Sequence, residues 1–200
     1  MPSIAKSPGS ARSRSAFFVL VPLLVCAQAG AQTATQPADV HAVPRWGMYL
    51  QAARTPHHVD AWTLGATLNW QDWRRSLWGS EVRGYWDFYA SRWSARGIGG
   101  DFDTTVLGVT PSFRFIPDAG HSRWFLDAGV GATLANRRFV TPAQAFSTRF
   151  NFASHLGIGV ELGQQRQHEL QLRLEHVSNA GIKEPNPGAN FVQLRYALHF

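Results

Sequence analysis

Apolar and polar residues alternate one by one along most of the chain from residue 46 onward. Every second residue from Trp62 to Trp70 is apolar, and the residues in between are small or polar. A β-strand has a side-chain period of two, so this pattern predicts strands and fits helical spacing poorly. Eight segments of this kind are predicted, at about 46–53, 60–70, 77–90, 103–115, 123–135, 148–163, 170–178 and 190–200.

The two faces of these segments differ in a way that indicates a membrane barrel. One face is apolar and rich in aromatic residues, as in a barrel that contacts lipid and both membrane interfaces. The other face carries charges of both signs, as a packed polar interior would, at Glu81, Arg83, Asp127, Arg149, Glu161, Arg173 and Glu175. We therefore predict an all-β fold, an eight-stranded antiparallel transmembrane β-barrel of the bacterial outer membrane. A soluble β-sandwich is the alternative, because its strands also alternate.

The connections between the segments predict the orientation of the barrel. An even strand count places both ends of the domain on one side, which is the periplasm for a bacterial barrel. Periplasmic turns are then expected at 71–76, 116–122 and 164–167, and outer loops at 54–59, 91–102, 136–147 and 179–189. Eight strands leave an interior that side chains fill, so no pore is expected.

The N-terminal segment has the pattern of an export signal. Lys6, Arg12 and Arg14 precede an apolar run from Ala16 to Cys26, and the small residues that follow contain an A-x-A cleavage site. This is the pattern of a secretory signal peptide, and its apolar run is too short to span a bilayer as a helix. We expect a signal peptide at residues 1–31, a flexible N-terminal lead at 32–44 and the barrel domain at 45–200.

Charge and cysteine content narrow the chemistry. Cleavage of the signal peptide removes half of the formal net charge of +6, which leaves too little positive charge to indicate a nucleic-acid partner. Cleavage also removes Cys26, the single cysteine, so neither disulfides nor thiol chemistry are expected. His57 and His58 are adjacent, but no cluster of acids or cysteines joins them, so we expect no metal site and no cofactor.

A histidine and a serine stand at the end of the seventh predicted strand. His176 and Ser178 share the phase of Leu172 and Leu174, so both side chains fall on the lipid-facing side. Residues two apart on a strand are separated by about 7 Å, which lets an imidazole reach a hydroxyl. Polar groups that face lipid are costly unless they serve a function there. Ser178 as nucleophile and His176 as general base would hydrolyse an ester in the outer leaflet, whereas a polar pair bonded to the loop is the alternative.

The residues after this pair form a longer motif. The segment from His176 to Gly188 reads HVSNAGIKEPNPG and resembles the active-site segment of the lipid A 3-O-deacylase (PagL-like) family. The closing strand and the terminal Phe200 are also similar. The resemblance implies removal of the ester-linked 3-hydroxyacyl chain at position 3 of lipid A, with His176 and Ser178 as catalytic residues. It also implies that Asn179 is linked to the oxyanion hole, where Gly181 would offer a backbone N–H at the turn.

One position departs from the pattern of that family. The family places an acid just after the PNxG turn to orient the histidine, but Gly188 is followed here by Ala189 and Asn190. Asn190 has the outward phase of Val192, and its side-chain carbonyl can accept the imidazole N–H. It would not supply the negative charge that steadies an imidazolium. Glu184, in the loop, is the alternative orienting residue.

These observations predict an outer-membrane serine esterase that remodels lipopolysaccharide. Its substrate would be lipid A, it would need no cofactor, and it would act as a monomer or a homodimer. Two alternatives stay open. A non-catalytic structural outer-membrane barrel would have no use for a His-x-Ser-Asn segment on its lipid face, whereas an outer-membrane phospholipase would share the nucleophile.

Overall fold

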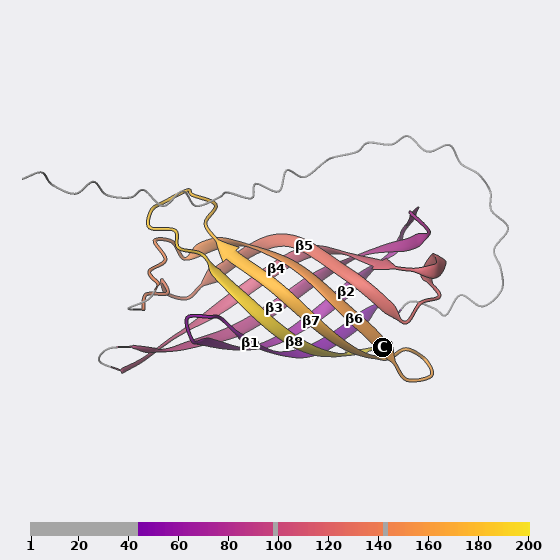
Figure 1. Cartoon of the computed structure of the whole chain (residues 1–200), viewed down its shortest axis with the longest axis horizontal. Helices are drawn as coiled ribbons and strands as arrows, with labels where there is room; N and C mark the ends of the chain where they lie inside the picture. The colour runs from indigo at the N-terminus through magenta and orange to yellow at the C-terminus, as the bar shows by residue number, and fades with distance from the viewer. Residues whose placement is uncertain (1–43, 98–99, 142–143) are drawn as a thin grey trace, which may run out of the picture. The chain divides into compact units, whose positions relative to one another are not determined.

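The strands close into one antiparallel barrel in chain order (Figure 1), which confirms the predicted all-β fold. This computed structural model describes residues 44–97, 100–141 and 144–200, so the expected signal peptide and nearly all of the expected lead lie outside the described residues. The described residues include no helix long and apolar enough to cross a membrane. The elements are β1 (Trp46–Arg54), β2 (Val59–Leu77), β3 (Ser80–Gly97), β4 (Gly100–Ile116), η1 (Asp118–Gly120), β5 (Trp124–Ala135), β6 (Phe150–Leu162), β7 (His168–Ser178) and β8 (Ala189–His199).

The barrel closes where the first strand meets the last. β1 pairs antiparallel with β8, and the backbones of Trp46 and Phe200 exchange hydrogen bonds of 3.2 and 2.9 Å. The start of β1 and the end of β8 therefore share one end of the barrel, which we call the terminal end. The opposite end, the loop end, carries the connections 136–149 and 179–188 (Figure 1).

The turn expected at 71–76 is wrong, because these residues belong to β2. The pairing of β2 with β3 shifts register between Asn69 and Arg74, so the extra residues are accommodated as a bulge in a long hairpin. The connection itself is confined to Trp78 and Gly79, whose φ angles of +51° and +74° are those of a two-residue hairpin turn. Trp78 therefore lies at the tip of the hairpin, although the segment predicted at about 77–90 includes it as a strand residue.

The outer loop expected at 91–102 is also wrong, because β3 and β4 continue through most of it and leave a connection at 98–99. Trp93 and Ala95 point into the barrel and are buried, and the ring of Trp93 lies 4.8 Å from that of Phe191 between centroids. The inward alternation thus persists along this hairpin. Its outward residues are polar, which hid the strand from a search for apolar outward faces.

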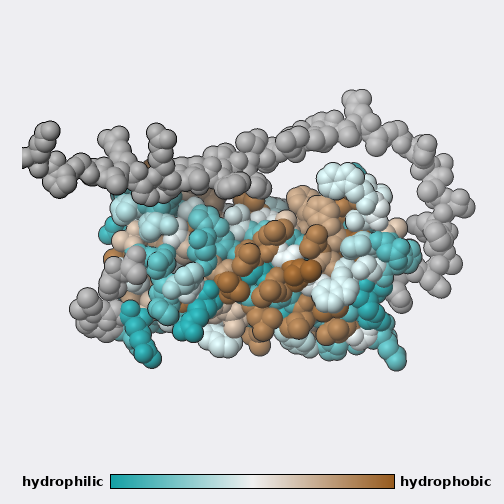
Figure 2. Space-filling view, viewed as in Figure 1, coloured by the Kyte–Doolittle hydropathy of each residue, from teal (hydrophilic) through white to brown (hydrophobic). Residues whose placement is uncertain are grey.

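The outward face of the barrel is apolar across its middle. Leu172 and Leu174 of β7 are exposed there, together with Leu156 of β6 and Val192 of β8. Figure 2 shows this surface as a brown area in the middle of the barrel, with hydrophilic surface toward both ends. A continuous apolar surface of this kind is typical of a barrel wall in contact with lipid, as the sequence predicts.

The inward face holds a network of buried polar groups. Asp87 accepts hydrogen bonds from Tyr49 (2.6 Å), Arg173 (3.2 Å) and Arg195 (3.0 Å). All four side chains are buried. Buried charges are stable only when they are paired and hydrogen-bonded, and Asp87 provides the shared counter-charge for Arg173 and Arg195.

Replacement of Asp87 by alanine is expected to destabilise the barrel by about 3–5 kcal/mol, because Arg173 and Arg195 would lose their shared counter-charge inside the protein. The measurement is the free energy of unfolding by urea in lipid vesicles. Asp60→Ala is the matched control, since it removes an exposed ion pair with Arg54 and should cost little. Equal losses in the two variants would contradict the structural role of the network.

Candidate active site

The end of β7 places His176 and Ser178 on the outside of the barrel. Both share the outward phase of Leu174, while Val177 between them points inward and is 1% exposed. The two polar side chains therefore lie on the lipid-facing wall, at the loop end of the strand, as the alternation predicts.

Strand pairing determines what lies beside this pair. His176 is directly opposite Asn190 on β8 and directly opposite Ser154 on β6. Ser178 is opposite Phe152 on β6. Side chains that are directly opposite have Cβ atoms about 4.5–5.5 Å apart. The imidazole is thus flanked by an amide and a hydroxyl, and the Ser178 hydroxyl is flanked by an aromatic ring.

The imidazole is held from the β8 side. Asn190 Oδ1 lies 2.6 Å from His176 Nδ1. An amide oxygen can only accept a hydrogen bond, so this contact favours a proton on Nδ1 and leaves Nε2 able to accept one. Of the two orienting residues that the sequence offers, Asn190 contacts the imidazole. Glu184 is exposed and instead accepts the backbone N–H of Asn186, at 2.9 Å.

The Ser178 hydroxyl and the His176 imidazole lie on the same face of β7. Within the described part of the chain, no hydrogen bond joins Ser178 Oγ to the imidazole of His176. Catalytic hydrogen bonds in substrate-free enzymes are often long or poorly aligned, and they tighten when the substrate binds. The shared face is compatible with a catalytic pair that forms when substrate binds.

Asn179 organises the loop that follows β7. The side chain is 1% exposed, and its Oδ1 accepts the backbone N–H of Gly181 at 2.9 Å. Its Nδ2 donates to the carbonyl oxygen of Lys183 (2.7 Å) and to Ser147 Oγ (3.0 Å). The backbone N–H of Asn179 donates to Asn186 Oδ1 at 3.0 Å. The backbone N–H groups of Asn179 and Gly181 therefore both have partners within the loop.

The connection between β5 and β6 supports the same loop from the other side. Ser147 Oγ donates to the carbonyl oxygen of Lys183 at 2.7 Å, and Gln144 Nε2 donates to that of Gly188 at 2.7 Å. Both donors are buried. Sequence reasoning missed these two residues, because they lie more than 30 positions from their partners and irregular loops carry no periodic signal.

Gly188 lies directly beside the imidazole of His176. Its φ is +65°, in the left-handed region that favours glycine. A Cβ at this position would lie 2.8 Å from His176 Cε1, closer than carbon atoms can pack without a shift. The glycine of the motif is therefore needed for the backbone conformation and for the space that the imidazole occupies.

Gly188→Ala is expected to lower kcat roughly tenfold, because the added methyl group would displace the imidazole from Asn190 and misplaced catalytic groups lose rate steeply. The measurement is the rate at which the purified protein hydrolyses lipid A, the substrate that the sequence resemblance implies. Gly79→Ala is the matched control: Gly79 has a φ of +74°, and nothing lies within 4 Å of the added Cβ. If both variants lose the same rate, backbone strain explains the loss and the contact with His176 does not.

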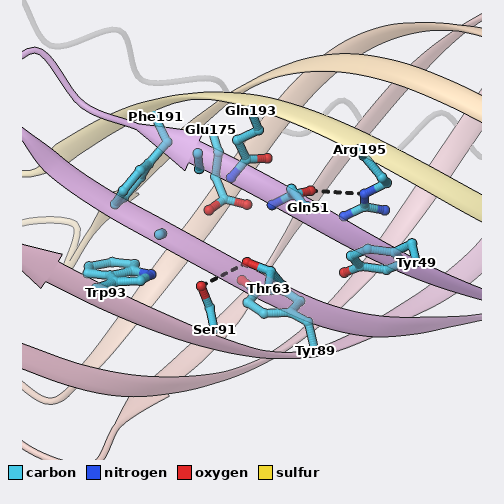
Figure 3. Close-up of a pocket in the computed structure, with 12 residues that line it drawn as sticks. Tyr49, Gln51, Thr63, Tyr89, Ser91, Trp93, Glu175, Phe191, Gln193 and Arg195 are labelled. Atoms are coloured by element: carbon cyan, nitrogen blue, oxygen red, sulfur yellow. Dashed lines mark hydrogen bonds between the residues drawn. The ribbon is translucent and has the colours of Figure 1, made fainter.

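A polar cavity lies inside the barrel, behind this wall. Glu175, Gln193, Gln51 and Arg195 are among the residues that line it, and Figure 3 shows the Glu175 carboxylate among these interior side chains. Glu175 precedes His176 in the chain but points to the opposite side of the sheet. It therefore cannot orient the imidazole, and the candidate chemistry lies on the outer wall and not in the cavity.

A membrane barrel that carries a histidine, a serine and an amide acceptor together on its outer wall defines a class, the membrane-embedded hydrolases whose substrate lies in the bilayer. A family model described as lipid A 3-O-deacylase (PagL) matches residues 60–199. The chain belongs to this lipid A 3-O-deacylase family.

Individual relatives agree with this family. The lipid A deacylase PagL of Bordetella bronchiseptica is 33% identical over 141 residues, which cover 67% of this chain and 75% of that protein. The protein of the same name from Pseudomonas aeruginosa is 28% identical over 188 residues, which cover 90% and 97%. A crystal structure of the outer membrane enzyme PagL is similar with a TM-score of 0.65 and 25% identity, and the match covers 77% of this chain and 99% of that one.

Proposed function

We propose that this enzyme removes the ester-linked 3-hydroxyacyl chain from position 3 of lipid A with Ser178 as nucleophile and His176 as general base. Family membership supports an ester hydrolase of the bacterial outer membrane that acts on lipid A. The observation that carries the residue assignment is the 2.6 Å contact between His176 and Asn190, on the outward face beside Ser178.

The proposed reaction has two halves. Ser178 Oγ attacks the ester carbonyl carbon while its proton passes to His176 Nε2. The tetrahedral intermediate then loses the sugar oxygen, which takes the proton back from the imidazolium and leaves an acyl-serine. Water next gives a proton to His176 and attacks the acyl-serine, which releases a 3-hydroxy fatty acid and restores Ser178. Asn190 keeps Nδ1 protonated, so Nε2 handles every proton.

Asn179 and Gly181 are the proposed source of oxyanion stabilisation, through backbone N–H groups at the start of the loop. Donors held in place by the protein need little reorganisation when charge develops. Asn186 Oδ1 has to leave the Asn179 N–H, and Asn179 Oδ1 has to leave the Gly181 N–H, before these donors can bind an oxyanion. The buried Asn179 side chain, with its contacts to Lys183 and Ser147, would hold the loop in shape during the exchange.

The function is tested with purified protein and two lipids, lipid A that carries a 3-O-acyl chain and a diacyl phospholipid. Mass spectrometry should show the loss of one 3-hydroxyacyl group from lipid A and an unchanged phospholipid. Intact lipid A after prolonged incubation would reject the proposed function in favour of a structural barrel. Hydrolysis of the phospholipid alone would move the assignment to a phospholipase.

Export and assembly complete the proposal. We infer that residues 1–31 are removed as a signal peptide and that 32–44 form a lead to the barrel domain, which the intact mass of the mature protein would test. One barrel supplies the nucleophile, the base and the orienting amide. The reaction therefore does not require the homodimer that the sequence leaves open, and cross-linking in the membrane would show whether one forms.

A further inference from the structure

The lipid-facing seam between β6 and β7 is apolar along its middle. It consists there of directly opposed apolar pairs, Leu156 with Leu174, Ile158 with Leu172 and Val160 with Leu170, and it ends at the terminal end with Leu162 opposite His168. The next pair toward the loop end is Ser154 with His176, and the last is Phe152 with Ser178. Ser154 thus adds a hydroxyl to the seam that has no part in the mechanism described above.

The hydroxyl of Ser154 is available to a ligand. None of the hydrogen bonds between described residues involves it, whereas the hydroxyls of Thr63 and Ser91 inside the barrel bond to each other at 2.8 Å. The imidazole opposite Ser154 already uses Nδ1 for Asn190, and the proposed mechanism uses its Nε2 for the proton of Ser178. A polar group that faces hydrocarbon is unfavourable without a partner, so a substrate hydroxyl would relieve this cost.

We propose that Ser154 binds the free 3-hydroxyl of the acyl chain that the enzyme removes, and so selects hydroxylated chains. This inference rests on the proposed function. Ser154 and Ser178 are diagonal neighbours on the paired strands, with Cα atoms about 7–8 Å apart. With the ester carbonyl at Ser178, a chain that follows the seam toward Leu156 and Leu174 passes Ser154. The hydroxyl is attached to the second carbon beyond the carbonyl, which places it between the two serines.

The residues on the two sides of Ser178 support this path for the acyl chain. On the β6 side, Ser178 is next to Phe152, and the ring of Phe152 packs edge-on against Phe150 with centroids 5.3 Å apart. On the β8 side, the pairing with β7 ends at Val177 and Ala189, and the first outward residue is the polar Asn190. The apolar wall beside Ser178 is therefore on β6, where an acyl chain would lie, and the β8 side offers polar groups to the sugar.

The test compares two synthetic acylated glucosamine phosphates that differ only in the 3-hydroxyl of the 3-O-acyl chain. Wild type is expected to prefer the hydroxylated substrate about tenfold in kcat/KM, the size of one partly exposed hydrogen bond. Ser154→Ala should remove this preference by losing rate on the hydroxylated substrate only. Ser154→Thr keeps a hydroxyl and should restore it. Ser94→Ala, at an exposed serine of β3, is the control for a change on the outer wall.

The outcomes separate the inference from the function on which it rests. If wild type hydrolyses both substrates and Ser154→Ala keeps the full preference for the hydroxylated one, the inference fails and the proposed function stands. Equal losses on both substrates would also overturn it, because they assign Ser154 a structural role. Hydrolysis by Ser178→Ala that disappears in the Ser154/Ser178 double variant would make Ser154 a second nucleophile and overturn it too. If wild type hydrolyses neither substrate, both proposals fall.

Discussion

Replacement of Ser178 by alanine is expected to abolish lipid A deacylation, with a fall in kcat on the order of 10⁶-fold, the scale seen when a serine hydrolase loses its nucleophile. His176→Ala should have nearly the same effect, and the double variant should be no worse than either single one. Groups that act as one unit lose their whole effect when the first is removed. The measurement is single-turnover hydrolysis by the purified protein, followed by mass spectrometry of the lipid.

The barrel itself should survive both substitutions. His176 and Ser178 point outward from a strand whose backbone pairs on both sides, so alanine removes no ladder hydrogen bond and leaves no cavity in the interior. Unfolding in urea should therefore match that of wild type. If Ser178→Ala hydrolyses lipid A at the wild-type rate while folded, the nucleophile has been assigned to the wrong residue.

The alternation of side chains was sufficient to predict the strands wherever one face meets lipid. It failed in the two hairpins at 71–76 and 91–102, and the physical reason differs between them. In the first, a bulge between Asn69 and Arg74 interrupts the period of two. In the second, the outward residues are polar although Trp93 still packs inside the barrel. A search for apolar outward faces detects neither case.

The sequence predicted those parts of the candidate site that lie on one strand and on its hairpin partner. The phase of β7 places His176 and Ser178 on one face, and the adjacent strand, β8, brings Asn190 beside the imidazole. The position of Ser154 beside the site could not be predicted in this way, because it depends on the register between β6 and β7. That register depends in turn on the conformation of residues 163–167. The only sequence signal for Ser154 was that its hydroxyl lies in the outward phase of its strand, between apolar neighbours.

Asn190→Asp is expected to raise kcat about tenfold, and Asn190→Ala is expected to lower it about 100-fold, because the orienting group of such a site both fixes the tautomer and stabilises the imidazolium. Asn190 already fixes the tautomer through Oδ1, at 2.6 Å from His176 Nδ1. Asn190 lacks only the negative charge that would stabilise the imidazolium. Aspartate has the same length and shape and adds that charge, whereas alanine removes both contributions. The measurement is kcat for lipid A with saturating substrate.

Glu184→Ala separates this role from the alternative in the loop. Glu184 accepts the backbone N–H of Asn186 and has no hydrogen bond to the imidazole, so its removal should leave kcat close to that of wild type. If Glu184→Ala is the damaging change and Asn190→Ala is not, the orienting role belongs to the loop.

A fall in kcat for Asn190→Asp would have a different meaning. It would mean that a second charge beside the imidazole, on the lipid-facing wall, costs more free energy than it contributes to stabilising the transition state. A neutral acceptor would then suit a base on the outside of a barrel better than a carboxylate.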